Sequence, residues 1–251
     1  MTAPVILSLE TATMAGSVWL GFGTVELATR IGDPKVSQSA TLLNDISESL
    51  AEAGVKLNEV DLFACASGPG SFTGLRIGIA TLKALAASLS RPCIGIPTLH
   101  AVAHAGGISA ATVALLPAGR GELFAQMFSV SADGIVTELD SATHLSPPML
   151  VAKYAGIKTL KWAGNGAHLQ RELLEKCAQE QGIYFFEELI EEKKTEHDAG
   201  IWELAAPELN LAKHVAALAL QLFPSTAIQS PHSLKAIYVR PSDAELNQKC
   251  R

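Results

Sequence analysis

Cysteine is scarce in this chain, and the few cysteines are isolated from one another. Cys65, Cys93, Cys177 and Cys250 form no Cys-x-x-Cys pair. The N-terminus also lacks the basic region and the cleavage site of a secretory signal peptide. We therefore expect a protein of the reduced cytoplasm.

Long apolar runs and an excess of basic residues are missing as well. The Ala-rich segment from Ile77 is interrupted by Thr81 and Lys83 and stops at Arg91-Pro92, so it is too short to cross a bilayer. The 19 Lys and Arg residues are outnumbered by 25 Asp and Glu residues, which gives a net charge of −6. A protein that grips a phosphate backbone normally clusters basic residues. We expect no membrane association, and any contact with RNA should be shared with a partner.

The most informative stretch is Gly68-Pro69-Gly70-Ser71-Phe72-Thr73-Gly74-Leu75-Arg76-Ile77, between a predicted buried strand and a predicted long helix. Glycine permits positive φ angles and close backbone approach, and the first turn of a helix presents N–H groups suited to a phosphate or a carboxylate. The spacing fits neither a Walker loop, nor a dinucleotide fingerprint, nor a serine-hydrolase elbow. The alternative is that the glycines only let the helix pack tightly on the sheet.

The first part of the chain reads as a mixed α/β domain over residues 1–107. An N-terminal hairpin is predicted, with Glu10 at the end of its first strand and Thr11-Ala12-Thr13 in its turn. Ser37-Gln38-Ser39 is expected to cap a helix that Gly54 closes, and Thr98 is expected to cap another. The predicted strands cover residues 5–10, 16–22, 61–66 and 93–96.

The second part repeats this order in weaker form, which predicts a smaller α/β domain over residues 108–204. Its predicted strands cover residues 112–116, 123–128 and 158–163, and the helix after Gly164-Asn165-Gly166 should turn Leu169, Leu173 and Leu174 inward. Residues 187–198 are charged and read as a solvated loop. Pro207 is expected in the first turn of a C-terminal helix, so that 205–251 packs back on the first domain as a helix and an extended tail.

Four motifs are distinctive in this chain: residues 6–13, Gly68 through Gly78, Gly95-Ile96-Pro97-Thr98-Leu99 and Ile237-Tyr238-Val239-Arg240. Together they resemble the TsaB family, formerly called YeaZ and described as glycopeptidase-like. The Pro-Gly-Ser-Phe-Thr-Gly-Leu-Arg run is the specific motif, and the match runs nearly end to end.

This resemblance implies the two-domain, actin-like ATPase fold, also called ASKHA or ribonuclease H-like. It implies a non-catalytic partner of TsaD in a complex, with the ATPase TsaE, that moves the threonylcarbamoyl group from threonylcarbamoyl-AMP to N6 of adenosine 37 of tRNAs reading ANN codons. It also implies a homodimer when the chain is alone, and only indirect contact with tRNA. No catalytic residue and no required cofactor are expected.

The resemblance places the surface for TsaD, or for a second copy, on the helices near 37–53 and 72–89. The second helix carries more apolar residues than one buried stripe requires, which favours a helix between a core and a partner. A fully buried central helix would show the same pattern. The predicted interface residues are Leu42, Leu43, Ile46, Leu50, Phe72, Leu75, Arg76, Ile79, Leu82 and Lys83.

The chain departs from the family pattern at three places. The family often has Asp at Glu10, His-Ser at Val36-Ser37, and Asp-Ala-Arg at Pro117-Ala118-Gly119. These differences bear on polar contacts made there rather than on the fold. They also argue against catalysis, which tolerates loss of charged groups less readily than packing does.

Two alternative functions, a metal site and a kinase or ATPase site, are suggested by a few polar residues. His100 and His104 are four residues apart and would share one helix face, but they have no obvious third ligand, so we expect no metal site. An acid such as Glu10 at the end of the first strand could hold a metal near phosphate, as in a small-molecule kinase or ATPase of this fold. The other role for Glu10 is to cap amides of its own turn.

A working ATPase would need a second acidic loop, and the turn at residues 117–121 has no acid before Glu122. We therefore rank weak or shared ATP or ADP contact above hydrolysis, and a stand-alone kinase remains the alternative function. The candidate nucleotide contacts are Glu10, Thr11, Thr13, Gly68, Gly70, Ser71 and Thr73.

Overall fold

The computed structural model describes residues 3–188, 200–223 and 230–239. The chain forms two compact units: Met1–Ala101 with Leu209–Arg251, and Val102–Glu208. These divisions lie a few residues from the sequence-based boundaries at 107 and 204, and the C-terminal segment belongs to the first unit. Within the described residues, no helix is long and apolar enough to cross a membrane.

The first unit is built on a five-stranded sheet of order β3-β2-β1-β4-β5. Strands β1 to β3 form an antiparallel meander, and β4 and β5 run parallel to β1. The predicted hairpin and the strands before and after the glycine stretch are confirmed, whereas β3 was not predicted. The strands are β1 (Val5–Glu10), β2 (Ser17–Phe22), β3 (Val25–Ile31), β4 (Leu62–Ala66) and β5 (Cys93–Ile96).

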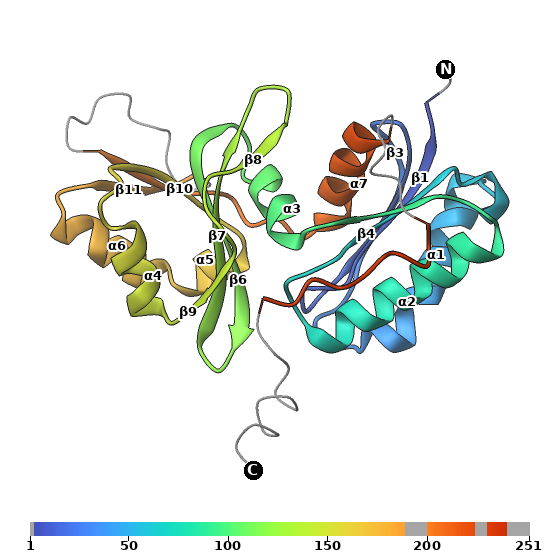
Figure 1. Cartoon of the computed structure of the whole chain (residues 1–251), viewed down its shortest axis with the longest axis horizontal. Helices are drawn as coiled ribbons and strands as arrows, with labels where there is room; N and C mark the ends of the chain where they lie inside the picture. Colours follow the sequence, from blue (N-terminus) through green and yellow to red (C-terminus); the bar gives the residue numbers. More distant parts are fainter. Residues whose placement is uncertain (1–2, 189–199, 224–229, 240–251) are drawn as a thin grey trace, which may run out of the picture. The chain divides into compact units, whose positions relative to one another are not determined.

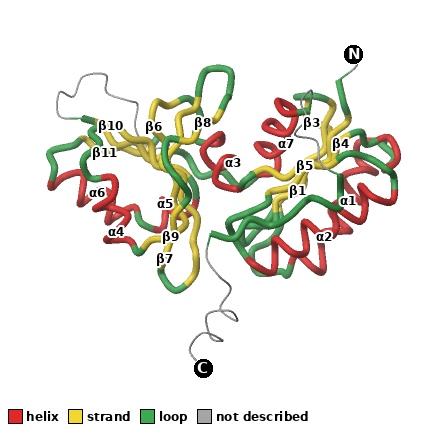
Figure 2. The backbone as a smooth tube through the Cα atoms, viewed as in Figure 1, coloured by secondary structure: helices red, strands yellow, loops and turns green. Residues whose placement is uncertain are grey.

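Helices cover both faces of this sheet (Figures 1 and 2). α1 and α2 lie on one face and α7 lies on the other, against β1, β2, β4 and β5. Leu7, Leu9, Leu20 and Phe63 of the sheet are fully buried in the core beneath α1 and α2. The helices of this unit are α1 (Gln38–Ala53), the short 3₁₀ helix η1 (Leu57–Glu59), α2 (Phe72–Ser88) and α7 (Leu211–Leu222). The division between the two units falls within α3 (Thr98–Ala105).

The helix ends correct three sequence-based expectations. Gly54 closes α1 in the left-handed conformation as predicted, but the Ser37 side chain makes no capping hydrogen bond. Thr98 is the first residue of α3, and its hydroxyl accepts a hydrogen bond from Gly68 N–H. α7 begins after Asn210, whose side chain caps it, so Pro207 lies before the helix rather than in its first turn. A side-chain acceptor at the N-cap fixes the start here more strongly than proline does.

The second unit contains a seven-stranded sheet in which β6, β7 and β8 are antiparallel, β9 pairs with β7, and β10, β12 and β11 run parallel to β6. A hairpin followed by parallel strands repeats the order of the first unit. The strands are β6 (Ser109–Gly119), β7 (Glu122–Val130), β8 (Val136–Glu138), β9 (Thr143–Leu145), β10 (Thr159–Ala163), β11 (Tyr184–Glu187) and β12 (Ile201–Leu204).

Three helices, α4 (Pro147–Tyr154), α5 (Asn165–Leu169) and α6 (Arg171–Glu180), complete this unit. Trp162 and Trp202 are fully buried in its core and meet edge to face. Leu174 points inward as predicted, but Leu169 is 68% exposed because α5 ends there and a new helix begins at Arg171. Of the predicted charged loop, residues 189–198 lie outside the described residues, as do Arg240 and Cys250.

Candidate functional site

The glycine-rich corner between β4 and α2 is packed against the turn of the N-terminal hairpin. A side chain at Gly74 would overlap the carbonyl oxygen of Thr11, and one at Gly78 would overlap the Thr11 hydroxyl. Gly70 approaches Ala12 so closely that a Cβ would lie 2.5 Å from the Ala12 carbonyl oxygen. The corner therefore uses its glycines for close approach between helix and hairpin, which is the packing alternative considered from the sequence.

Three backbone N–H groups of this corner donate hydrogen bonds within the chain. Ser71 N–H donates to Ala12 O at 2.7 Å, and Gly68 N–H donates to the Thr98 hydroxyl at 3.0 Å. Gly74 N–H donates to the Ser71 hydroxyl at 3.2 Å, so Ser71 caps α2. Phosphate or nucleotide contact at the candidate residues stays a prediction, and it would have to compete with these bonds.

Glu10 is fully buried and is bonded to its own turn. Thr13 donates to its carboxylate twice, from N–H at 2.8 Å and from the hydroxyl at 2.6 Å. Burial raises the pKa of the Glu10 carboxyl above its usual range, and the hydrogen bonds from Thr13 oppose that rise. Of the two roles considered for Glu10, capping its own turn is the one these bonds display.

Gln38 joins the same corner and was not among the predicted site residues. Its Nε2 donates to Thr13 O at 2.8 Å, and its amide fills the space beside Gly16 and Gly74. Gln38 also lines a small pocket together with Glu10 and other residues of the hairpin and α1. A polar residue at the start of a helix gives no sequence signal for such a contact, because the partner atoms come from distant turns.

The predicted interface divides into buried and accessible residues. Five of the ten belong to the core of the first unit and cannot contact a partner directly in this conformation, because each is at most 8% exposed. These buried residues are Leu42, Ile46, Leu75, Ile79 and Leu82. The accessible ones, which we call the α1/α2 face, are Leu43, Leu50, Phe72, Arg76 and Lys83. Leu43 is 66% exposed.

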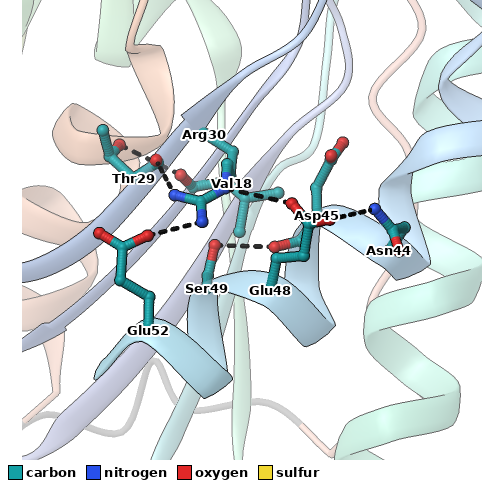
Figure 3. A network of polar contacts seen from close by, with 8 residues as sticks. All are labelled: Val18, Thr29, Arg30, Asn44, Asp45, Glu48, Ser49 and Glu52. Carbon is teal, nitrogen blue, oxygen red and sulfur yellow. Dashed lines mark hydrogen bonds and ion pairs between the residues drawn. The ribbon is translucent and has the colours of Figure 1, made fainter. Parts of the chain in front are cut away.

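A polar network holds α1 against β3 beside this face (Figure 3). The Arg30 guanidinium of β3 pairs with Glu48 and Glu52 of α1 and donates to Thr29 O. These carboxylates raise the pKa of Arg30, with the hydrogen bond that Arg30 donates to Glu52 as the largest cause. The network fixes α1 on the sheet and engages two of its three acidic side chains.

Two further sequence-based candidates are the histidine pair of α3 and the turn between β6 and β7. No three His, Cys, Asp or Glu side chains among the described residues could together hold a metal ion. In the turn between β6 and β7, Gly119, Arg120 and Gly121 all have positive φ angles, and the Glu122 carboxylate that follows lies 2.9 Å from His144 Nε2.

Comparison with known proteins shows which sequences are similar to this chain. The family model of TsaD, tRNA N6-adenosine threonylcarbamoyltransferase, matches residues 37–145. The tRNA threonylcarbamoyladenosine biosynthesis protein TsaB of Escherichia coli is 32% identical over 149 residues, 58% of this chain and 64% of that protein. The chain thus spans just under two thirds of this relative's length.

Solved structures show the fold. The YeaZ structure from Pseudomonas aeruginosa superposes with a TM-score of 0.72 at 22% identity and covers 94% of this chain and 99% of its own. An ROK hexokinase from Thermus thermophilus has a TM-score of 0.50 at 14% identity and covers 88% of this chain and 100% of its own. The chain is therefore similar in sequence to a protein named TsaB, and it shares the fold of the YeaZ structure and of the hexokinase, which is the actin-like fold that the motifs implied.

Proposed function

We propose that this chain acts in tRNA threonylcarbamoyladenosine biosynthesis as a non-catalytic partner of TsaD. In this role it binds TsaD through its α1/α2 face and supports transfer of the threonylcarbamoyl group to adenosine in tRNA. TsaE joins the complex, tRNA is contacted only indirectly, and the complex works in the cytoplasm. The relatives named TsaB, and the TsaD model that matches residues 37–145, support this assignment.

The observation that carries the partner role is the exposure of the α1/α2 face. Leu43 is 66% exposed although Leu42 and Ile46 on the same helix are buried in the core. An exposed leucine on α1, together with the partly buried Leu50 on α1 and Phe72 on α2, provides apolar surface of the kind that protein partners cover. The same face would hold a second copy when TsaD is absent.

The state of Glu10 supports the non-catalytic part of the proposal. Both of its carboxylate oxygens accept hydrogen bonds from Thr13, so metal binding would have to break those bonds. A carboxylate that is committed to its own turn is poorly placed to hold a metal beside phosphate. The chain should therefore hydrolyse no ATP by itself.

Binding to purified TsaD tests the proposal, with Leu43→Asp as the interface variant. Introducing a charge into a buried apolar contact should weaken binding by at least about tenfold. Met149→Asp is the matched control, because Met149 is a 59% exposed apolar residue on α4 of the other unit. Failure of the wild-type chain to bind TsaD, or robust ATP turnover by the chain alone, would contradict the proposal.

A further inference from the structure

The C-terminal segment 230–239 is attached to the first unit along α2 (Figure 1). Leu234 is 2% exposed and belongs to the hydrophobic core of that unit. Ile237 N–H donates to Ser67 O at 2.7 Å, and Lys83 Nζ donates to Leu234 O at 3.2 Å. The segment is thus fixed by a buried side chain and by hydrogen bonds at two places.

Two glycines make room for this segment. A Cβ at Gly95 would lie 2.6 Å from Leu234 Cδ1, and one at Gly68 would overlap the Ile237 carbonyl oxygen. Gly68 also has a φ of +112°, a conformation that residues with side chains rarely adopt. The glycine corner therefore receives the C-terminal segment on one side and the hairpin turn on the other.

The segment ends in a cluster of aromatic and cationic side chains on the α1/α2 face. The rings of Tyr238 and Phe72 lie 5.3 Å apart, and the Arg76 guanidinium carbon lies 3.7 Å from the centre of the Phe72 ring. Tyr238 remains 48% exposed and Arg76 is exposed. Stacking orients the plane of the guanidinium while its N–H donors still face solvent.

The charges of α2 make Arg76 the group that a partner would meet. α2 contains Arg76 and Lys83 but no Asp or Glu, and the Lys83 ammonium is bonded to Leu234 O. Among the described residues, no carboxylate forms an ion pair with Arg76, whereas Arg30 and Arg91 each pair with an acid. Arg76 is therefore oriented but is not neutralised within the described chain.

We propose that the C-terminal segment positions Phe72 and Arg76 so that Arg76 binds a carboxylate of the partner protein. Tyr238 is the positioning residue, because it acts through the ring of Phe72. A protein carboxylate fits better than a tRNA phosphate, since one exposed arginine among apolar side chains lacks the cluster of basic groups that a nucleic-acid backbone requires. This inference rests on the proposed function, since TsaD is taken as the partner.

The test measures TsaD affinity for full-length variants at low and high salt. Arg76→Ala should weaken binding by about 10- to 100-fold, which corresponds to loss of a charge-assisted hydrogen-bonded pair, and the loss should shrink at high salt. Tyr238→Ala should weaken binding by about 2- to 10-fold, and Tyr238→Phe should bind within about twofold of the wild type. Arg91→Ala removes one arginine elsewhere in the unit and serves as the charge control.

A double-mutant cycle distinguishes positioning from a general effect on folding. Adding Tyr238→Ala to Arg76→Ala should change affinity by less than about twofold, because the tyrosine acts only through the stacked arginine. Full additivity of the two losses, or unchanged binding in Arg76→Ala, would overturn the inference while leaving the proposed function intact. A loss of binding that salt does not affect, or a direct affinity for tRNA that Arg76→Ala abolishes, would also overturn it. No binding by the wild type would overturn both.

Discussion

Replacing Gly74 by alanine tests whether the glycine corner is shaped by contact with the hairpin turn. Gly74 lies in the first turn of α2, where alanine would ordinarily stabilise the helix by up to about 1 kcal/mol. In this fold, however, the new Cβ would overlap the Thr11 carbonyl oxygen, which is a backbone atom. That atom lies in a turn held by the bonds between Glu10 and Thr13, so it cannot rotate away.

The size of the effect follows from these opposing contributions. Overpacking a well-packed site typically costs about 1–3 kcal/mol, and contact with a fixed backbone atom belongs at the upper end. After subtraction of the gain in helix propensity, we expect Gly74→Ala to lower the free energy of unfolding by about 2 kcal/mol. For a chain of this size, this corresponds to a melting temperature roughly 4–8 °C lower.

Thermal and urea unfolding followed by circular dichroism would measure the change. Gly156→Ala is the matched control, because a Cβ at Gly156 would meet nothing within 4 Å, and its φ is not in the left-handed region. The control should be neutral or slightly stabilising. A Gly74→Ala variant as stable as the control would refute the close approach between α2 and the hairpin turn.

Three further changes test other contacts. Because folding raises the pKa of Glu10, its contribution to the free energy of unfolding is fully present below the ordinary value of 4.5 and is lost as the pH rises through the folded pKa. Glu10→Gln should remove that loss, which urea unfolding from pH 4.5 to about 8 would measure. A variant whose urea midpoint falls with pH as steeply as that of the wild type would contradict this assignment. Lys161 and Glu203 form a largely buried ion pair at 2.7 Å. Either Lys161→Met or Glu203→Gln alone should lower the free energy of unfolding by about 3–5 kcal/mol, because it leaves the other charge buried without its partner. In chemical unfolding, the double variant should lose less than the sum of the two single losses. Asn210 caps α7 and donates to the Thr29 hydroxyl at 2.8 Å; Asn210→Ala should cost about 1–2 kcal/mol by thermal unfolding, and no loss would show that the cap is dispensable.

Strand β3 shows where sequence patterns were insufficient. Its residues Val25 and Leu27 are both exposed, and its register with β2 shifts between Leu20 and Gly21. An edge strand with an irregular register has no clean alternation of apolar and polar residues, so the period that predicts a strand is missing. By contrast, β1 and β4 are buried along nearly their whole length and were predicted from their apolar runs.

The α1/α2 face shows a different limit. Helical spacing grouped Leu42, Leu43, Ile46 and Leu50 on one side of α1, but Leu42 and Ile46 face the sheet and Leu43 faces outward. Neighbouring residues on a helix point about 100° apart, so a wide apolar stripe has a core side and an outer side. The spacing alone could not say where the sheet would lie.

The amino-acid sequence was enough to predict the N-terminal hairpin and the strand, glycine turn and helix that recur in each unit, because local apolar periodicity and turn residues decide these features within a few residues. Only the tertiary structure decided what the glycine corner and Glu10 do. Folding brings together the groups that contact the glycine corner and Glu10, namely the Ala12 carbonyl, the Thr13 donors and the Ile237 backbone. Ile237 is also distant from the corner in the sequence. For the same reason the contact between Tyr238 and Phe72 could not be predicted, since a contact between residues so far apart leaves no local pattern.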